Sequence, residues 1–149
     1  MVRDDLVSKV FNISESQIDD KVNELLNLIN NEREKNGLIK LQILPRLQEI
    51  AMTKAEDMVK NNYFSHKSPN YGNPFDMMKN FGITYKSAGE NIAGNSSIEG
   101  AFNSWLLSEN HKQNILSTAY NYIGIGISPS EKYGYIIVAM FIRKIASRY

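Results

Sequence analysis

A chain of 149 residues, 42% hydrophobic and 22% charged, has the length and composition of one globular domain that can bury a core without disulfides or metal. Seventeen basic and sixteen acidic residues give a formal charge of +1, which argues against nucleic-acid binding. The absence of cysteine excludes disulfides, thiolate metal sites and thiol nucleophiles.

The N-terminal segment MVRDDLVSKVF is mixed in charge and lacks the apolar core of a secretory signal. We interpret it as part of a short helix or a docked arm. The chain is then either cytoplasmic or a mature form whose leader lies outside these residues. Any lipid-anchoring cysteine would belong to that leader.

Three helices are predicted in the first half of the chain. Ser14 and Gln17 form a capping box before a periodic apolar pattern that continues to about residue 35. Pro45 suits the first turn of a second helix, which ends at residues 61–62. A third helix is predicted over 73–82, between an asparagine-proline start and a glycine stop.

The second half combines a strand, a helix and a hairpin. Residues 83–93 fit a strand, and Ser96 or Ser97 caps a fourth helix that HKQNIL extends by one turn. The alternation in IGIGI predicts another strand, SPSEKYG a hairpin connection, and YIIVAMFI a strand buried on both faces. The pattern predicts an α/β layered domain with helices on both sides of the sheet.

The two histidines are the strongest candidates for chemistry. His66 lies in the turn-rich segment YFSHKSP, and His111 follows the predicted fourth helix. Neutral imidazole binds zinc, copper or nickel, and histidine also carries protons near neutral pH. Because the two are far apart in sequence, unlike the paired histidines on one metalloprotease helix, the residues alone favour imidazoles that hydrogen-bond their own loops.

Two acids accompany the histidines. Glu90 ends a predicted strand beside a glycine, where its carboxylate either points into a cleft or is a solvated turn acid. Glu109 lies at a helix end and is interpreted as solvent-exposed. Trp105 recurs at helical spacing with other apolar residues, which is typical of core.

These segments, taken in order, resemble a known family. YFSHKSP, GENIAG, the tryptophan before SENHKQNIL, and the closing IGIGI with its strand look like the bacterial, cysteine-free branch of the CAP superfamily. This superfamily comprises cysteine-rich secretory, antigen-five and pathogenesis-related-one proteins. The similarity divides the chain into an N-terminal arm or short helix at 1–20 and a CAP domain at 21–149.

The resemblance implies a single-domain three-layer α-β-α sandwich with a central, mainly antiparallel sheet. It also implies a surface cleft lined by two histidines and one or two glutamates. YFSHKSP supplies His66, GEN supplies Glu90 and HKQNIL supplies His111. Glu109 comes one step later than the commoner spacing, so its membership stays open. The cysteine-held extensions of eukaryotic members, and their partners, do not carry over.

Three functions follow from the resemblance. The favoured one is a non-catalytic extracytoplasmic binding module with a metal site of His66, His111 and Glu90. The two histidines hold a divalent metal such as zinc, and Glu90 orients an imidazole or a bound water. The second is a metal-assisted, protease-like hydrolase with Glu90 as general base; no serine is marked as an activated nucleophile, so an enzyme is less favoured. The third is sterol or lipid binding or export in an apolar groove away from the histidines.

The resemblance also implies an extracellular or cell-surface location, as a lipoprotein if a leader with a lipid-attachment cysteine precedes these residues. We expect a monomer whose partner is a sterol, a fatty acid, or a host or surface protein. Neither nucleic-acid binding nor a transmembrane segment is expected.

Overall fold

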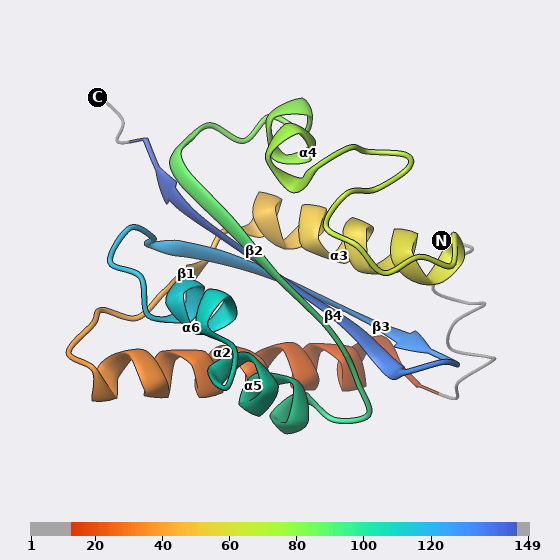
Figure 1. Ribbon diagram of the computed structural model, residues 1–149, viewed down its shortest axis with the longest axis horizontal. Helices are drawn as coiled ribbons and strands as arrows, with labels where there is room; N and C mark the ends of the chain where they lie inside the picture. The colour runs from red at the N-terminus through yellow and green to blue at the C-terminus, as the bar shows by residue number, and fades with distance from the viewer. Residues whose placement is uncertain (1–12, 146–149) are drawn as a thin grey trace.

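The computed structural model describes residues 13–145 as three layers with a four-stranded sheet in the middle (Figure 1). Helices α2, α5 and α6 cover one face of the sheet, and α3 and α4 cover the other. The predicted α-β-α sandwich is therefore confirmed. The elements are α2 (Glu15–Lys35), β1 (Gln42–Ile43), α3 (Pro45–Lys60), α4 (Pro74–Asn80), β2 (Tyr85–Asn95), α5 (Ile98–Leu106), α6 (Glu109–Ile115), β3 (Tyr122–Ser130) and β4 (Gly134–Lys144).

The helices begin where local capping chemistry predicts. The Ser14 side chain accepts the Gln17 N–H, and the Gln17 side chain accepts the Ser14 N–H at 2.7 Å, which completes the capping box of α2. Asn73 caps α4 by accepting the Asp76 N–H, and Ser97 caps α5 by accepting the Gly100 N–H. Helix α2 crosses the boundary predicted between residues 20 and 21, and residues 1–12 of the predicted arm lie outside the described part of the chain.

The sheet order is β1-β3-β4-β2, and every pair is antiparallel except β1 with β3. The mainly antiparallel sheet and its β3–β4 hairpin were both predicted. Strand β3 continues through Pro129 to Ser130, whereas the sequence placed Pro129 in the connection. Strand β1 pairs with β3 at Tyr122 and Ile123 and does not reach Pro129. The missing N–H of Pro129 therefore removes no hydrogen bond to β1.

The IGIGI segment of β3 contacts the helix layers on both faces of the sheet. Its isoleucines face the core beneath α2 and α5, while Gly124 and Gly126 face α3. A Cβ at Gly124 would lie 2.4 Å from the Leu47 carbonyl oxygen, and one at Gly126 would lie 2.1 Å from that of Ala51. The glycines therefore let the α3 backbone pack directly on the sheet.

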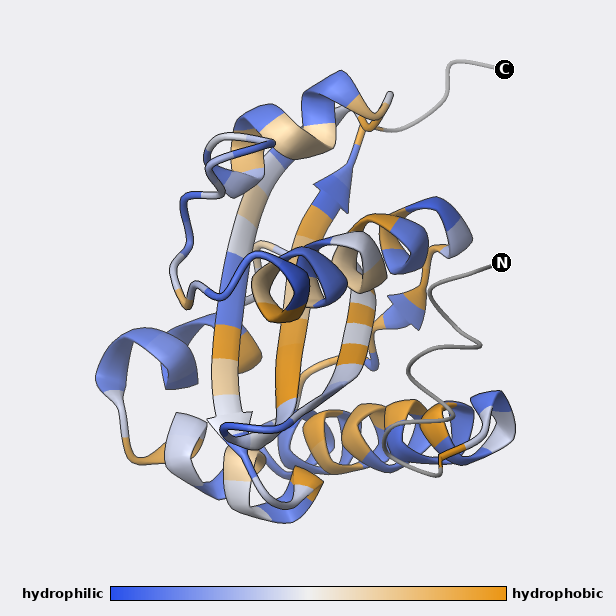
Figure 2. Cartoon of the chain, turned by 90° about the vertical axis from the view of Figure 1, so that its right-hand side faces the viewer, coloured by the Kyte–Doolittle hydropathy of each residue, from blue (hydrophilic) through white to orange (hydrophobic). Residues whose placement is uncertain are grey.

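Strand β4 is buried on both faces, as its continuous apolar run predicts. Alternate residues contribute to the core with α2, α5 and α6 (Ile137, Ala139, Phe141) and to the core with α3 and α4 (Ile136, Val138, Met140, Ile142). Figure 2 shows hydrophobic residues gathered along the strands and on the helix faces that cover them. This rigid sheet carries the β2 residues of the site.

Candidate functional site

The loop that joins α3 to α4 carries His66, and Asp57 holds this loop. The buried Asp57 carboxylate accepts hydrogen bonds from Ser68 Oγ at 2.6 Å, Asn70 Nδ2 at 2.8 Å, Asn61 Nδ2 at 2.6 Å and the Tyr63 hydroxyl. Burial alone raises the pKa of Asp57, but the four hydrogen bonds outweigh it and hold that pKa below its ordinary value. A single ionised carboxylate thus fixes the loop around His66.

Glu90 on β2 binds the imidazole of His66. Its carboxylate side chain is 1% exposed, and Oε1 lies 2.7 Å from His66 Nδ1. An ionised carboxylate only accepts hydrogen bonds, so Nδ1 is the donor in this contact, and the Nδ1–H tautomer of imidazole has its lone pair on Nε2. The His66 side chain is 54% exposed, which leaves Nε2 open to a ligand from solvent.

Lys54 on α3 lies beneath this pair and was not predicted as a site residue. Its ammonium nitrogen is 3.4 Å from Glu90 Oε2 and 3.5 Å from Oε1, and it donates a hydrogen bond to the His66 carbonyl oxygen. Burial lowers the pKa of Lys54, and the Glu90 charge opposes this shift. Its position one helical turn from both Ile50 and Met58, two apolar residues buried on α3, was the available signal.

Helix α6 carries His111, and β2 positions it. His111 Nδ1 lies 2.8 Å from Ser108 Oγ, and its ring stacks on Trp105 with 6.4 Å between centroids and 19° between planes. Trp105 is buried, as predicted, and its Nε1 donates to the Ile92 carbonyl oxygen at 3.0 Å. Asn91, next to Glu90, donates to the His111 carbonyl oxygen at 3.0 Å.

His66 affects the protonation of His111. Burial lowers the pKa of His111, and the charge of nearby His66 lowers it further. His111 is therefore neutral at neutral pH, as a metal ligand must be. The structure brings His66, Glu90 and His111 to one region, since Glu90 contacts His66, its neighbour Asn91 contacts His111, and the two histidines are near enough to interact electrostatically.

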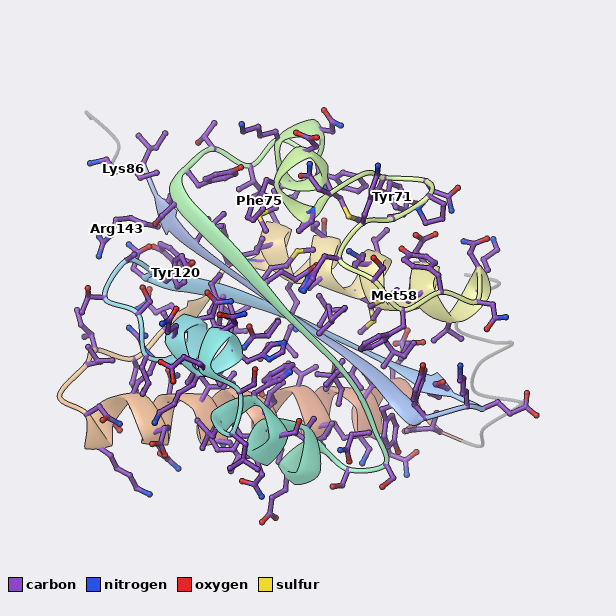
Figure 3. All side chains as sticks on the ribbon, in the orientation of Figure 1. Met58, Tyr71, Phe75, Lys86, Tyr120 and Arg143 are labelled. Carbon is purple, nitrogen blue, oxygen red and sulfur yellow. The ribbon has the colours of Figure 1, made fainter. Side chains whose placement is uncertain are left out.

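The far end of α6 is held by polar contacts that sequence patterns did not reveal. Asn114 Nδ2 donates to Asn91 Oδ1 at 2.8 Å, and the Tyr120 hydroxyl, beside α6, reaches Asn114 Oδ1 at 3.4 Å (Figure 3). Buried Arg33 of α2 donates through Nη1 to the carbonyl oxygens of Ile115 and Ser117, each at 2.9 Å. These contacts keep the α6 backbone, and hence His111, against the sheet.

Glu109 lies apart from this arrangement. It is exposed at the first position of α6 and accepts a hydrogen bond from Gln113 Nε2 at 3.4 Å on the same helix. This placement agrees with the interpretation of Glu109 as a solvent-exposed helix-end residue.

The site offers nitrogen donors rather than a ready set of three metal ligands. Among residues 13–145, no group of three or more His, Cys, Asp or Glu side chains is arranged to hold a metal ion. The Glu90 oxygens are already engaged by His66 and Lys54. In the same part of the chain neither Nε2 atom of His66 and His111 has a hydrogen-bond partner.

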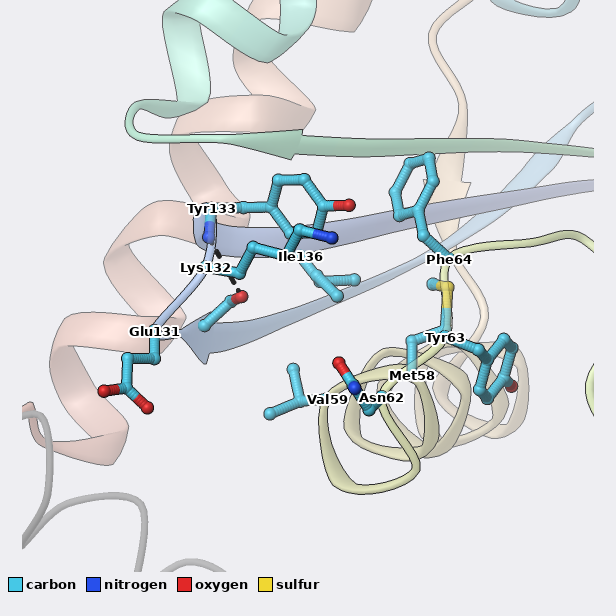
Figure 4. A pocket seen from close by; sticks show the side chains of 10 residues that line it. Met58, Val59, Asn62, Tyr63, Phe64, Glu131, Lys132, Tyr133 and Ile136 are labelled. Atoms are coloured by element: carbon cyan, nitrogen blue, oxygen red, sulfur yellow. Dashed lines mark hydrogen bonds between the residues drawn. The ribbon is translucent and has the colours of Figure 1, made fainter.

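A separate pocket of about 570 Å³ lies between the end of α3 and the β3–β4 hairpin (Figure 4). Phe64 and Tyr133 form a tilted aromatic pair on its wall, with centroids 5.5 Å apart. Neither His66 nor His111 lines it, so this pocket is distinct from the histidine site. The other lining residues are Met58, Val59, Asn62, Tyr63, Ser130, Glu131, Lys132 and Ile136.

The fold and site define a class of protein: an α-β-α domain with a Glu-bound histidine on one loop and a second histidine stacked on tryptophan. The model of the CAP, or cysteine-rich secretory protein, family matches residues 26–141, and the chain belongs to this family. Among the helices of residues 13–145, none has the length and apolar character needed to cross a bilayer.

Two Bacillus subtilis proteins are similar in sequence. YkwD is 48% identical over 122 residues, covering 81% of this chain and 46% of YkwD. The membrane protein YlbC is 38% identical over 131 residues, covering 85% of this chain and 35% of YlbC. The chain thus spans less than half the length of these relatives.

Solved structures show the same fold. An extracellular protein with an SCP domain from Bacillus anthracis has a TM-score of 0.79 at 29% identity, over 89% of this chain and 44% of that one. An outer surface protein from Borrelia burgdorferi has a TM-score of 0.78 at 21% identity, over 85% and 94%. A cysteine-rich secretory protein from Staphylococcus aureus has a TM-score of 0.72 at 20% identity, over 87% and 40%.

Proposed function

We propose that this chain is a non-catalytic extracytoplasmic binding module in which His66 and His111 hold a divalent metal such as zinc. The 2.7 Å contact between His66 Nδ1 and Glu90 Oε1 carries the proposal. A carboxylate that accepts the Nδ1–H of a histidine fixes its tautomer and makes Nε2 a better metal ligand. Glu90 then orients a ligand instead of being one.

The donor set fits zinc with modest affinity. Two neutral imidazoles supply two of the four ligands that zinc usually takes, and water would supply the others. Trp105 and Ser108 restrict the ring of His111 as Glu90 restricts that of His66. A bound zinc ion would add a positive centre that accepts a further ligand from a partner.

The surroundings of Glu90 favour binding over catalysis. A general base must reach the proton that it accepts, whereas the Glu90 side chain is 1% exposed and contacts both Lys54 and His66. Ser108 is the N-cap residue of α6, and its hydroxyl contacts His111 of the same short helix. We interpret this contact as one that orients the imidazole within the helix. We therefore propose no hydrolytic role for these residues.

The extracytoplasmic location is supported by proteins of the same fold. The Bacillus anthracis protein is described as extracellular and the Borrelia burgdorferi protein as an outer surface protein. A lipid anchor and a host or surface protein as partner remain part of this proposal. Immunoblots of cytoplasmic, membrane and culture-supernatant fractions test the location, and a signal confined to the cytoplasm contradicts it.

Calorimetric zinc titration tests the metal. We expect saturable binding by the wild type and loss of measurable binding in His66→Ala and in His111→Ala, because one imidazole alone holds zinc weakly. Glu109→Gln is the matched control, since Glu109 is exposed on α6 and accepts a hydrogen bond from Gln113 of the same helix. Isotherms that are the same for all four proteins would remove the metal from the proposed function.

A further inference from the structure

Lys54 and Glu90 are a buried pair of opposite charges directly behind His66. Their side chains are 0% and 1% exposed. Burying two charges is costly even when they are paired, and an apolar residue in place of Lys54 would suit the α3 core as Ile50 and Met58 do. The position of Lys54 therefore points to a role beyond packing.

The hydrogen bonds that the Lys54 ammonium makes within residues 13–145 lead to His66 directly or through Glu90. Its ammonium lies 3.4 Å from Glu90 Oε2 and 3.5 Å from Oε1, the oxygen that His66 Nδ1 approaches at 2.7 Å. The same ammonium donates to the backbone carbonyl of His66. Lys54 thus binds both the backbone of His66 and the carboxylate that binds its ring.

We propose that Lys54 is the positioning residue that makes Glu90 a hydrogen-bond acceptor for His66 and keeps Glu90 from binding the metal itself. Lys54 neutralises the carboxylate and engages both of its oxygens. The site then presents two Nε2 atoms and no anionic oxygen.

This role determines which cations the site accepts, a consequence that rests on the proposed metal function. Calcium and magnesium take oxygen ligands, whereas zinc, copper and nickel bind imidazole well. Because Lys54 neutralises Glu90 and engages its oxygens, the His66–His111 site selects zinc, copper or nickel over calcium and magnesium. Glu90 is then the group that orients the His66 imidazole, and Lys54 is the residue that holds Glu90 in that role.

The tautomer of His66 tests the positioning role without any metal. A carboxylate offers an oxygen to each of the two donors, Lys54 and His66 Nδ1–H, whereas a glutamine amide has only one oxygen. In Glu90→Gln we expect the charged ammonium to take that oxygen and His66 to shift to the Nε2–H form. In Lys54→Met/Glu90→Gln no ammonium competes, and the Nδ1–H form of the wild type returns.

Nitrogen NMR shifts of the imidazole distinguish the two tautomers at a pH where His66 is neutral. Unfolding curves of each variant show whether it is folded, and the doubly neutral variant leaves no unpaired buried charge. If Glu90→Gln and the double variant give the same His66 tautomer, the positioning role is wrong. Wild-type His66 in the Nε2–H form would overturn it equally.

Metal titration tests the selectivity. We expect Lys54→Met to bind zinc about tenfold more tightly and to gain measurable calcium binding, and Glu90→Gln to bind zinc about tenfold more weakly. The double variant should return close to wild type because both charges are removed together. Lys60→Met, on the exposed face of α3, is the charge-matched control and should leave zinc binding unchanged.

The two proposals fail in different ways. No zinc binding by the wild type contradicts the metal function, while the tautomer experiment still decides the role of Lys54. Zinc binding by the wild type with equal affinities in all variants contradicts the role of Lys54 and leaves the metal function standing.

Discussion

Asp57 of helix α3 holds the His66 loop through hydrogen bonds to its side-chain carboxylate. Four side chains between residues 61 and 70 donate hydrogen bonds to it, and Asp57 itself is 6% exposed. Hydrogen bonds to a charged group contribute more than neutral ones, and a donor left without its acceptor is penalised as well. We therefore expect Asp57 to contribute to stability as well as to the shape of the site.

Replacing Asp57 by Asn should lower the free energy of unfolding at neutral pH by about 2–4 kcal/mol, since an amide cannot accept all four bonds. The folded pKa of Asp57 lies below its ordinary value of 3.8, so the unfolded chain binds this proton more readily. The stability that ionised Asp57 contributes is complete above pH 3.8 and is lost as the pH falls through the folded pKa of Asp57. Denaturant unfolding of both proteins across this range measures it.

The exposed residue Asp19 on α2 provides the control for Asp57. Asp19→Asn should stay within about 0.5 kcal/mol of the wild type at neutral pH. Equal stability of Asp57→Asn and wild type at neutral pH would show that the loop does not depend on this carboxylate.

Sequence reasoning found the site residues that sit in recognisable segments and missed those that depend on distant partners. His66, Glu90 and His111 each lie in a segment that resembles the family. Lys54 interrupts an apolar stripe, and its partner Glu90 lies 36 residues away. Periodicity marks such a position as buried but cannot show which charge neutralises it.

At the scale of elements, local signals located the helix ends well. The capping box of α2 and the asparagine cap of α4 act within three residues, so the sequence contains the whole interaction. Helix α6 was predicted as one added turn and instead runs from Glu109 to Ile115. Its support comes from Asn91 and Arg33 on other elements, which no local pattern reports.

The packing of α3 on the sheet requires a residue without a side chain at Gly126 of β3. Gly126→Ala should reduce the free energy of unfolding by about 1–3 kcal/mol, since the new Cβ would overlap the Ala51 carbonyl and push α3 from the sheet. Thermal or denaturant unfolding measures this loss.

Gly94→Ala on β2 is the comparison for Gly126. A Cβ there would meet the Tyr133 ring at 2.7 Å, and a side chain near the hairpin can move more easily than a helix backbone. We expect a smaller loss than for Gly126→Ala. The reverse order would mean that α3 adjusts to the added methyl group.

For the molecule as a whole, the two-residue alternation of IGIGI and the apolar run YIIVAMFI were enough to predict the C-terminal hairpin and the buried strand β4. The position of β1 did not, because its two residues pair in parallel with β3 about 80 residues later and form no local turn with it. The sandwich places the His66 loop, β2 and α6 together, so the site exists only in the assembled fold. Its ligands should therefore stabilise the folded chain as a unit.

Zinc should raise the unfolding midpoint of the whole domain through mass action. At a free zinc concentration of 100 times Kd the folded state gains about 2.7 kcal/mol if the unfolded chain does not bind the metal. Differential scanning fluorimetry with zinc, then with excess chelator, measures a reversible shift. His66→Ala and His111→Ala should show none, and Glu109→Gln should match the wild type.

Acid should weaken this stabilisation in a defined direction. The folded pKa of His111 lies below its ordinary value of 6.5, so the unfolded chain takes up this proton first. The contribution of neutral His111 is complete above 6.5 and is lost as pH falls towards the folded pKa. Protons also compete with zinc for the Nε2 atom of His111, so the zinc-induced shift should decrease over the same interval. A shift that stays constant or grows on acidification would place the metal on carboxylates elsewhere, because only ligands that stay deprotonated in acid could sustain it.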